Sequence, residues 1–287
     1  MGFYFRLHPK VTLHLFDNLI KPILLYNSDF WGCLKLPNNN PIENTHMRFC
    51  KDLLGVQRQT SNFGVLLEMG RVPIMIYGKK NAIKNWARIH IEGKANQIVL
   101  WTHLNSIDNQ LKWSESVSEC LNRMGIGGEH TNKFVDKSAF QRMTDIFHQE
   151  AFAEINRDKS KLRTYAKIKQ EQGMENYLNI VRNVDRRTHL SKLRLSNHDL
   201  MIEKGRHQGL EINQRKCPFC PTNTLEDESH FLLSCKVFTF LRDILLGKRY
   251  KYFPTLSDTN IVNYTGIYLQ KAMELRRFIL SKHKNTD

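Results

Sequence analysis

The sequence lacks long hydrophobic runs, a disulfide framework and a secretory leader. The longest apolar stretches, such as residues 20–26, are too short to cross a bilayer, and a lysine and a proline interrupt this one. The N-terminus carries no apolar segment of signal-peptide length. Cys33, Cys50 and Cys120 are widely spaced among apolar residues, which favours buried thiols in a reducing compartment. We therefore expect an intracellular protein with no membrane anchor.

Signatures of common catalytic sites are also missing. No Gly-x-Ser-x-Gly motif occurs, so the nucleophile elbow of an α/β-hydrolase is excluded. The glycines of residues 125–128 lack the Lys-Ser/Thr pair of a phosphate-binding loop and fit a helix terminator better. We assign no catalytic residue.

Acidic residues are few for the number of basic ones. Among 287 residues, 43 are Lys or Arg and 28 are Asp or Glu, which gives a formal net charge of +15. This charge exceeds what solubility requires. A surface so basic attracts polyanions, of which nucleic acid is the commonest large one.

Apolar residues recur at spacings of three and four along most of the chain, which predicts a mainly α fold. Pro22 should interrupt the first helix, and Asn40-Pro41-Ile42-Glu43 has the pattern of an N-cap followed by a first turn. Short hairpin strands are expected only beside the last three cysteines. The expected helices cover residues 12–25, 41–54, 64–70, 74–91, 110–124, 138–155, 174–182, 185–195, 236–246 and 265–282.

A charge-rich stretch at residues 157–172 marks the main boundary along the chain. We expect a larger helical domain before it and a smaller helical domain after it. The regions predicted in this way are 1–156, a basic helical region at 157–216, a cysteine module at 217–250 and a C-terminal helix at 251–287.

Four residues near the C-terminus form the most specific motif: Cys217, Cys220, His230 and Cys235 read Cys-x2-Cys-x9-His-x4-Cys. Three thiolates and one imidazole suit a tetrahedral Zn²⁺ site. Such a closed set is structural, because it leaves no position for substrate or an activated water, and the metal supplies much of the folding energy of a small module. The alternatives are a chance cluster of core residues, or His207 in place of His230.

A basic stretch precedes the motif, with nine Lys or Arg and four acidic residues between residues 182 and 216. Guanidinium and ammonium groups contact phosphate, so this stretch is our candidate nucleic-acid interface, with a solvated helix face as the alternative. The predicted phosphate-contacting residues are Arg186, Arg187, Lys192, Arg194, Arg206, Arg215 and Lys216.

Several segments together resemble the C-terminal region of non-LTR (LINE-type, jockey-like) retrotransposon reverse transcriptases. In the second half these are Leu-Arg-Leu-Ser-Asn-His-Asp-Leu at 193–200 and the Cys-Cys-His-Cys module, with acidic residues just before its histidine. In the first half, residues 15–26, 31–32, 46–56 and 68–73 are similar to the region after the polymerase palm and to the thumb. The resemblance implies a helical, thumb-like domain followed by a zinc knuckle.

The chain departs from this family in its catalytic residues. A reverse transcriptase holds two Mg²⁺ with paired aspartates, and no Asp-Asp pair occurs here; the nearest stretch, Tyr26-Asn-Ser-Asp29, has one. We therefore expect a thumb-plus-zinc fragment of an RNA-directed DNA polymerase, inactive alone. The resemblance implies binding to RNA, DNA or both, and access to the nucleus. Protein partners are not indicated; the rival hypotheses are a zinc-stabilised protein-interaction fragment and a non-functional relic of the element.

Overall fold

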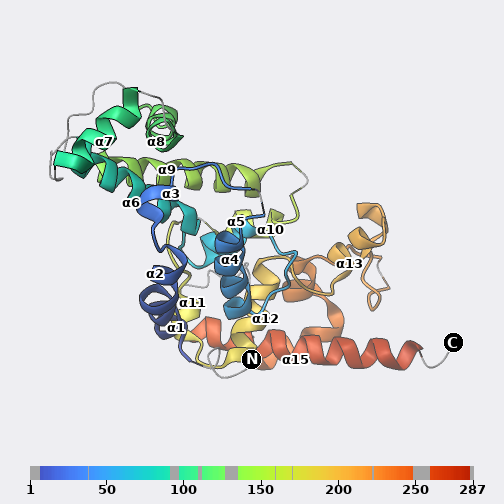
Figure 1. Cartoon of the computed structure of the whole chain (residues 1–287). Coiled ribbons are helices and arrows are strands. Elements are labelled where there is room, and N and C mark those ends of the chain that lie inside the picture. Colours follow the sequence, from blue (N-terminus) through green and yellow to red (C-terminus); the bar gives the residue numbers. More distant parts are fainter. Residues whose placement is uncertain are drawn as a thin grey trace. The chain divides into compact units, whose positions relative to one another are not determined.

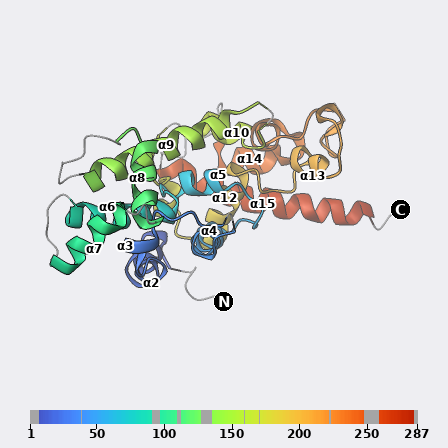
Figure 2. The same ribbon diagram turned by 45° about the horizontal axis from the view of Figure 1, so that its top comes forward.

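The computed structural model describes residues 7–37, 39–90, 97–108, 112–126, 135–158, 160–169, 171–221, 223–247 and 259–284, and it is mainly α-helical, as predicted (Figures 1 and 2). Within these ranges no strand occurs, and β pairing is limited to two isolated antiparallel bridges. One of them, Lys216 with Leu225, lies where hairpin strands were expected. None of the helices described is long and apolar enough to cross a membrane.

The chain divides into two compact units that are not consecutive in sequence. Unit 1 comprises Met1–Thr12, Cys50–Arg71 and Ala153–Asp287, and unit 2 comprises Leu13–Phe49 and Val72–Phe152. The transition at Ala153 lies close to the boundary predicted near residue 157. Sequence patterning could not show that residues 50–71 belong with the C-terminal part.

Unit 2 is built around a small core in which Phe16 and Ile74 are buried, and the ring of Phe16 stacks on Phe49 at 4.1 Å. Pro22 lies in the first turn of a new helix that follows a π-helical turn, so the predicted interruption is confirmed. Helix α1 Pro9–Leu15 is divided between the two units. The elements that lie wholly or mainly in unit 2 are η2 Phe16–Ile20, α2 Lys21–Leu24, α3 Ser28–Trp31, α4 Pro41–Leu54, α6 Ile74–His90, α7 Gln97–Asp108, α8 Lys112–Arg123 and α9 Val135–Asn156.

The N-terminus of α4 follows the predicted cap only in part. The Asn40 side chain accepts a hydrogen bond from the Ile42 N–H at 3.0 Å, as expected of an N-cap. Glu43 does not reach back to close a capping box; it accepts from the Met75 N–H at 3.2 Å. The backbone donor to Glu43 is therefore the N–H of Met75 at the start of α6, and not an N–H at the start of α4.

Two of the three cysteines expected to be buried prove to be half-buried neighbours in unit 2. Cys50 is buried, whereas Cys33 and Cys120 are only partly covered and share a thiol–thiol hydrogen bond. That bond, with the charge of Lys79, lowers the pKa of Cys120 to about 7. Sequence spacing gave no sign of this pair, because 86 residues separate its members.

Unit 1 is organised by α12, which packs along the long C-terminal helix α15 (Figure 1). The contact is close at Gly266 of α15, where an added Cβ would lie 3.0 Å from the Cβ of Arg186. The other elements of unit 1 are shorter than α12 and α15. Its elements are α5 Asn62–Glu68, α10 Arg163–Ile168, α11 Tyr177–Ile180, α12 Val184–Arg194, α13 Met201–His207, η3 Ile212–Gln214, η4 His230–Ser234, η5 Lys236–Phe238, α14 Thr239–Leu245 and α15 Thr259–Lys284.

A buried ion pair ties residues 50–71 to the rest of unit 1. The Arg194 guanidinium donates from Nε and Nη2 to the two carboxylate oxygens of Glu68 at 2.6 and 3.1 Å, and Nη2 also lies 2.8 Å from Glu175. The rings of Tyr165 and Tyr177 flank the guanidinium at 5.6 and 5.5 Å. These charges are shielded from water, so each depends on its partners.

We predict that Arg194→Ala lowers the free energy of unfolding by about 3–5 kcal/mol, because it leaves Glu68 charged and buried without its partner. Denaturant unfolding of the purified chain measures this. Lys271→Ala is the matched control, since Lys271 pairs with Glu274 on the exposed side of α15 and should change stability by less than ~1 kcal/mol. Equal, small effects of both substitutions would contradict the assignment.

Candidate metal centre

The four residues of the cysteine–histidine motif come together in unit 1. Cys217 Sγ lies 3.9 Å from Cys235 Sγ, and Cys220 Sγ lies 3.7 Å from Cys235 Sγ and 3.5 Å from His230 Nε2. All four residues are buried, and their ligand atoms lie within 4.8 Å of one another. The group could hold a metal ion, as the spacing predicted. His207 is exposed at the end of α13 and does not belong to it.

The first two ligands lie on a tight turn. The backbone N–H of Phe219 hydrogen-bonds to the Cys217 sulfur, and the Cys217 N–H donates to the Thr224 carbonyl at 2.8 Å. The returning strand-like segment then pairs Lys216 with Leu225. Backbone N–H groups aimed at a ligand sulfur favour its thiolate form.

The other two ligands bracket a π-helical turn, η4. Asp227 Oδ1 accepts from the His230 N–H at 2.7 Å at the start of the turn, and the Cys235 N–H donates to the His230 carbonyl at 2.8 Å at its end. Because that bond spans five residues, the turn is wider than a turn of α-helix. His230 directs Nε2 to Cys220, while Nδ1 lies 3.4 Å from Ser234 Oγ.

The sulfur atoms influence one another's protonation. The thiol of Cys235, with the N–H of Phe219, lowers the pKa of Cys217 to about 4 even though burial acts in the opposite direction. The same contact raises the pKa of Cys235. Without a cation, therefore, one thiolate forms at the expense of its neighbour, whereas a metal ion stabilises all three thiolates at once.

A small aromatic core lies next to the cluster. Phe231, Phe238 and Tyr268 are fully buried, and the first two rings meet edge to face at 5.0 Å. The Tyr268 hydroxyl of α15 donates to the Phe231 carbonyl at 2.8 Å. Arg242 of α14 donates to the Cys235 carbonyl at 2.6 Å, so it fixes the backbone of a ligand residue directly.

Two buried acidic residues just before His230 connect the module to its surroundings. Glu226 forms a two-point ion pair with Arg276 of α15, at 2.9 and 2.8 Å, and accepts from the Met201 N–H at 2.6 Å. Both partners of the pair are almost fully buried. This pair holds the returning segment of the cysteine turn against α15.

Glu228 is the centre of a second buried network. It accepts two hydrogen bonds from Arg163 at 3.1 and 2.9 Å, one from Thr164 at 2.9 Å, and a contact from His198 Nε2 at 3.0 Å. Burial alone would raise its pKa, but the hydrogen bond and charge of His198, with Arg163, outweigh burial and hold the pKa at about 2. Glu228 is therefore a permanently charged acceptor inside unit 1.

Three of the predicted phosphate-contacting residues are engaged internally. Arg187 is buried and donates to the carbonyls of residues 181 and 182; Arg194 pairs with Glu68. Arg215 donates to the Leu210 and Ile202 carbonyls. These guanidinium groups stabilise the fold, and we leave them out of the interface proposed below.

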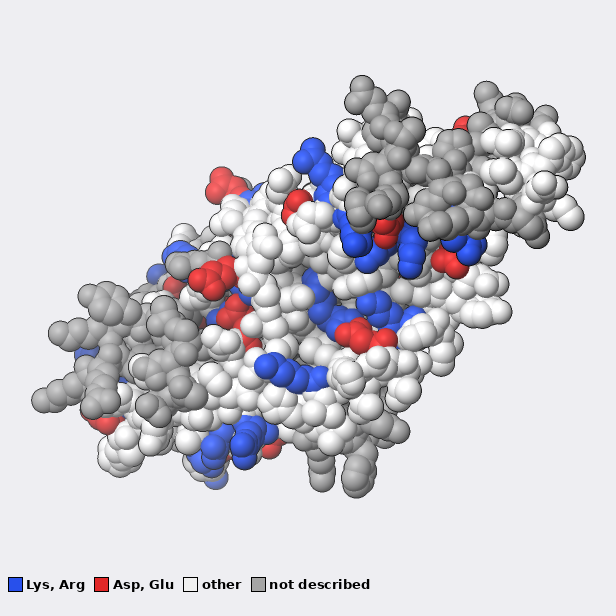
Figure 3. All heavy atoms as spheres, turned by 90° about the vertical axis from the view of Figure 1, so that its left-hand side faces the viewer, with Lys and Arg blue, Asp and Glu red and all other residues white. Residues whose placement is uncertain are grey.

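The other four predicted residues are more accessible. Lys216 is exposed, and Arg186 and Lys192 are half-buried. Arg206 is 40% exposed and pairs with Glu203 at 3.0 Å. On the face drawn in Figure 3, Lys and Arg side chains occur in several small groups with acidic side chains between them.

Sequence reasoning missed the partners of the acidic residues. It noted acidic residues before His230, but nothing local indicated that Glu226 pairs with Arg276, 50 residues later, or that Glu228 contacts His198. The available signal was the run of acidic residues Glu226, Asp227 and Glu228 shortly before the apolar residues 231–233. Comparison of the chain with family models, with curated proteins and with solved structures finds no match.

We predict that Cys220→Ser abolishes stable metal binding, because it removes one of four converging ligands. Elemental analysis of dialysed protein measures the metal content per chain. Cys33→Ser is the control: Cys33 is a thiol outside the cluster and should leave the metal content unchanged. Retention of metal by Cys220→Ser would show that the cluster is not the binding site.

A second prediction concerns Glu228. Glu228→Gln should lower the free energy of unfolding by about 3 kcal/mol, since it removes the charge that Arg163 and His198 share. Thermal or denaturant unfolding checks this, with Glu171→Gln as the exposed control. If both variants unfold like the parent chain, the network has no stabilising role.

Proposed function

We propose that the metal is a structural Zn²⁺. Three thiolates and one imidazole are soft to borderline ligands, the set that selects zinc among common divalent ions. A tetrahedron with Zn–S bonds of ~2.3 Å places its sulfur atoms about 3.8 Å apart. The sulfur–sulfur distances of 3.7 and 3.9 Å agree with that spacing.

The zinc would organise the module and take no part in a reaction. Four protein ligands complete a tetrahedral shell, so no position is left for substrate. The module itself is small, with an aromatic core of few residues, and gains folding energy from ligation. Cys217, Cys220, His230 and Cys235 would be the ligands.

We further propose that unit 1 binds nucleic acid. The observation that carries this is the position of a buried Cys-Cys-His-Cys group in the same compact unit as accessible cationic residues, in a chain of net charge +15. Phosphate contacts of this kind supply affinity that depends on salt and is independent of sequence. The contacting residues we propose are Arg186, Lys192, Arg206 and Lys216.

In this proposal the chain corresponds to the thumb and zinc module of a non-LTR retrotransposon reverse transcriptase. The support is the set of quoted segments; three residues from two of them, Glu68, Arg194 and His198, are members of the buried ion pairs of unit 1. It would hold RNA or DNA for a polymerase whose catalytic aspartates lie elsewhere. Alone, it would incorporate no nucleotides.

The test is binding of labelled single-stranded RNA and duplex DNA across a salt series. Affinity should fall steeply as salt rises, and Arg206→Ala and Lys216→Ala should each reduce the slope of log affinity against log salt by about 1. Lys10→Ala, at an exposed lysine of α1, is the control and should leave the slope near that of the parent.

Two results would contradict this function. Binding that does not respond to salt would exclude phosphate contacts as its source. Zinc-loaded protein that binds neither nucleic acid would favour a zinc-stabilised protein-interaction fragment, the rival hypothesis.

A further inference from the structure

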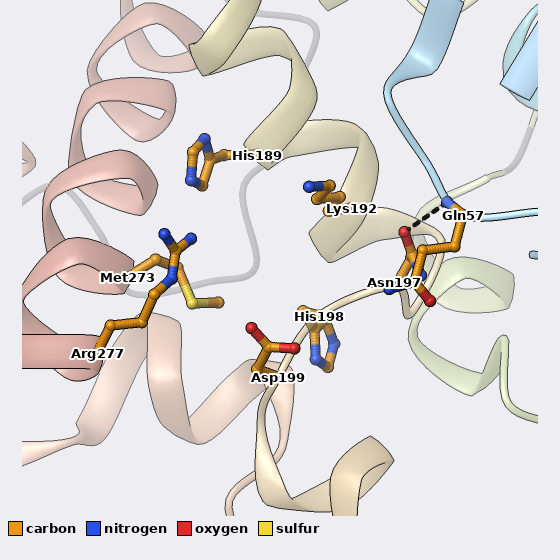
Figure 4. A pocket seen from close by; sticks show the side chains of 8 residues that line it. All are labelled: Gln57, His189, Lys192, Asn197, His198, Asp199, Met273 and Arg277. Carbon is orange, nitrogen blue, oxygen red and sulfur yellow. Dashed lines mark hydrogen bonds between the residues drawn. The ribbon is translucent and has the colours of Figure 1, made fainter. Parts of the chain in front are cut away.

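A polar pocket lies in unit 1 between α12 and α15 (Figure 4). Its volume is about 110 Å³, enough for several water molecules but well below the ~300–1,000 Å³ of sites that enclose whole cofactors. The pocket therefore suits one small polar group of a larger ligand. It is lined by Gln57, His189, Lys192, Asn197, His198, Asp199, Met273 and Arg277.

The end of α12 shapes one wall of the pocket. Ser196 adopts a left-handed conformation with φ of 50°, and the Asn197 N–H donates to the Lys192 carbonyl at 2.8 Å, which closes the helix. The Ser196 hydroxyl donates to the Lys161 carbonyl at 2.7 Å, which holds this turn in place. Asn197 Oδ1 accepts from the Gln57 N–H at 3.0 Å, as the dashed line in Figure 4 shows.

Two cationic side chains in the pocket lack an internal counter-ion. The side chains of Lys192 of α12 and Arg277 of α15 form no ion pair or hydrogen bond with any residue that the structure describes. His189 lies on the same wall as Lys192, and its Nδ1 is engaged by the Asp185 carbonyl at 2.7 Å. An anion between α12 and α15 would be contacted from both helices.

Two further side chains add hydrogen-bonding groups to the pocket. The His198 side chain is 2% exposed; its Nε2 contacts Glu228, and its Nδ1 is buried with no partner among the described residues. With the positive charge that acts on Glu228, the His198 ring carries a hydrogen on both nitrogens, so Nδ1 is a donor. Asp199 is exposed and adds a carboxylate that forms no ion pair with a described residue.

Two cations and an unpaired carboxylate in one pocket select a ligand that carries both an anion and a hydroxyl donor. A phosphate alone would meet the Asp199 carboxylate and be repelled, whereas a ribose hydroxyl donates to a carboxylate. The 2′-hydroxyl is the group by which a protein distinguishes RNA from DNA.

We propose that this pocket binds one ribose–phosphate unit of an RNA strand. Lys192 and Arg277 contact the phosphate, Asp199 accepts from the 2′-hydroxyl, and the oxygen of that hydroxyl accepts from His198 Nδ1–H. The inference rests on the nucleic-acid-binding function proposed above and adds to it a preference for RNA over DNA.

The first test uses the zinc-loaded full chain and single-stranded oligonucleotides of one uracil-containing sequence, made with ribose or with deoxyribose. We expect tighter binding of the ribose form, and Arg277→Gln should weaken its binding roughly tenfold. Lys271→Gln, on the exposed side of the same helix, is the matched control and should have little effect.

Asp199→Ala is the decisive variant, because the two possible roles of this carboxylate predict opposite results. If Asp199 accepts from the 2′-hydroxyl, RNA binding weakens and the preference for ribose falls towards unity. If it only repels phosphate, both affinities rise by the same factor, which would overturn the proposal.

Failure of this inference is distinguishable from failure of the proposed function. Equal binding of both oligonucleotides, unchanged by Arg277→Gln and still sensitive to salt, would exclude the pocket and leave general nucleic-acid binding intact. Absence of binding to either oligonucleotide would remove both.

Discussion

The convergence of three cysteine sulfurs and one histidine nitrogen within 4.8 Å is the constraint on which the C-terminal half of the molecule depends. Sulfur atoms this close compete for protons, as the opposed pKa shifts of Cys217 and Cys235 show. A single cation would remove that competition by stabilising every thiolate together. The turns that carry these four residues are short, and a bound metal would restrain them in place of the regular hydrogen bonds of a longer helix or sheet.

Buried ion pairs connect this cluster to the neighbouring helices of unit 1. Glu226 joins the cysteine turn to α15 through Arg276, and Glu228 joins it to Arg163 and His198. Each pair is costly to bury and strongly destabilising to break, which makes the arrangement specific to one packing of the helices. The same His198 that Glu228 fixes then lines the pocket between α12 and α15, so the metal module and the proposed RNA contact share one support.

Local pattern predicted the longer helices except α7, the Cys-Cys-His-Cys group and the cap at Asn40, because each depends on residues that are near one another in the sequence. The sequence could not predict contacts across long separations. It placed Arg187 and Arg194 in an interface because basic charge indicates phosphate binding, whereas burial assigns both to the fold. The joining of residues 50–71 to the C-terminal unit depends on Glu68 meeting Arg194, 126 positions away. No periodicity encodes such a pairing.

Amide hydrogen exchange of the full chain, with Zn²⁺ added and after treatment with a chelator, tests this account most directly. If the cluster supports unit 1, metal removal will abolish protection in residues 215–235 and also in the part of α15 that carries Tyr268 and Arg276. Loss of protection confined to the cysteine turn, or no change at all, would show that the helices are held together without the metal.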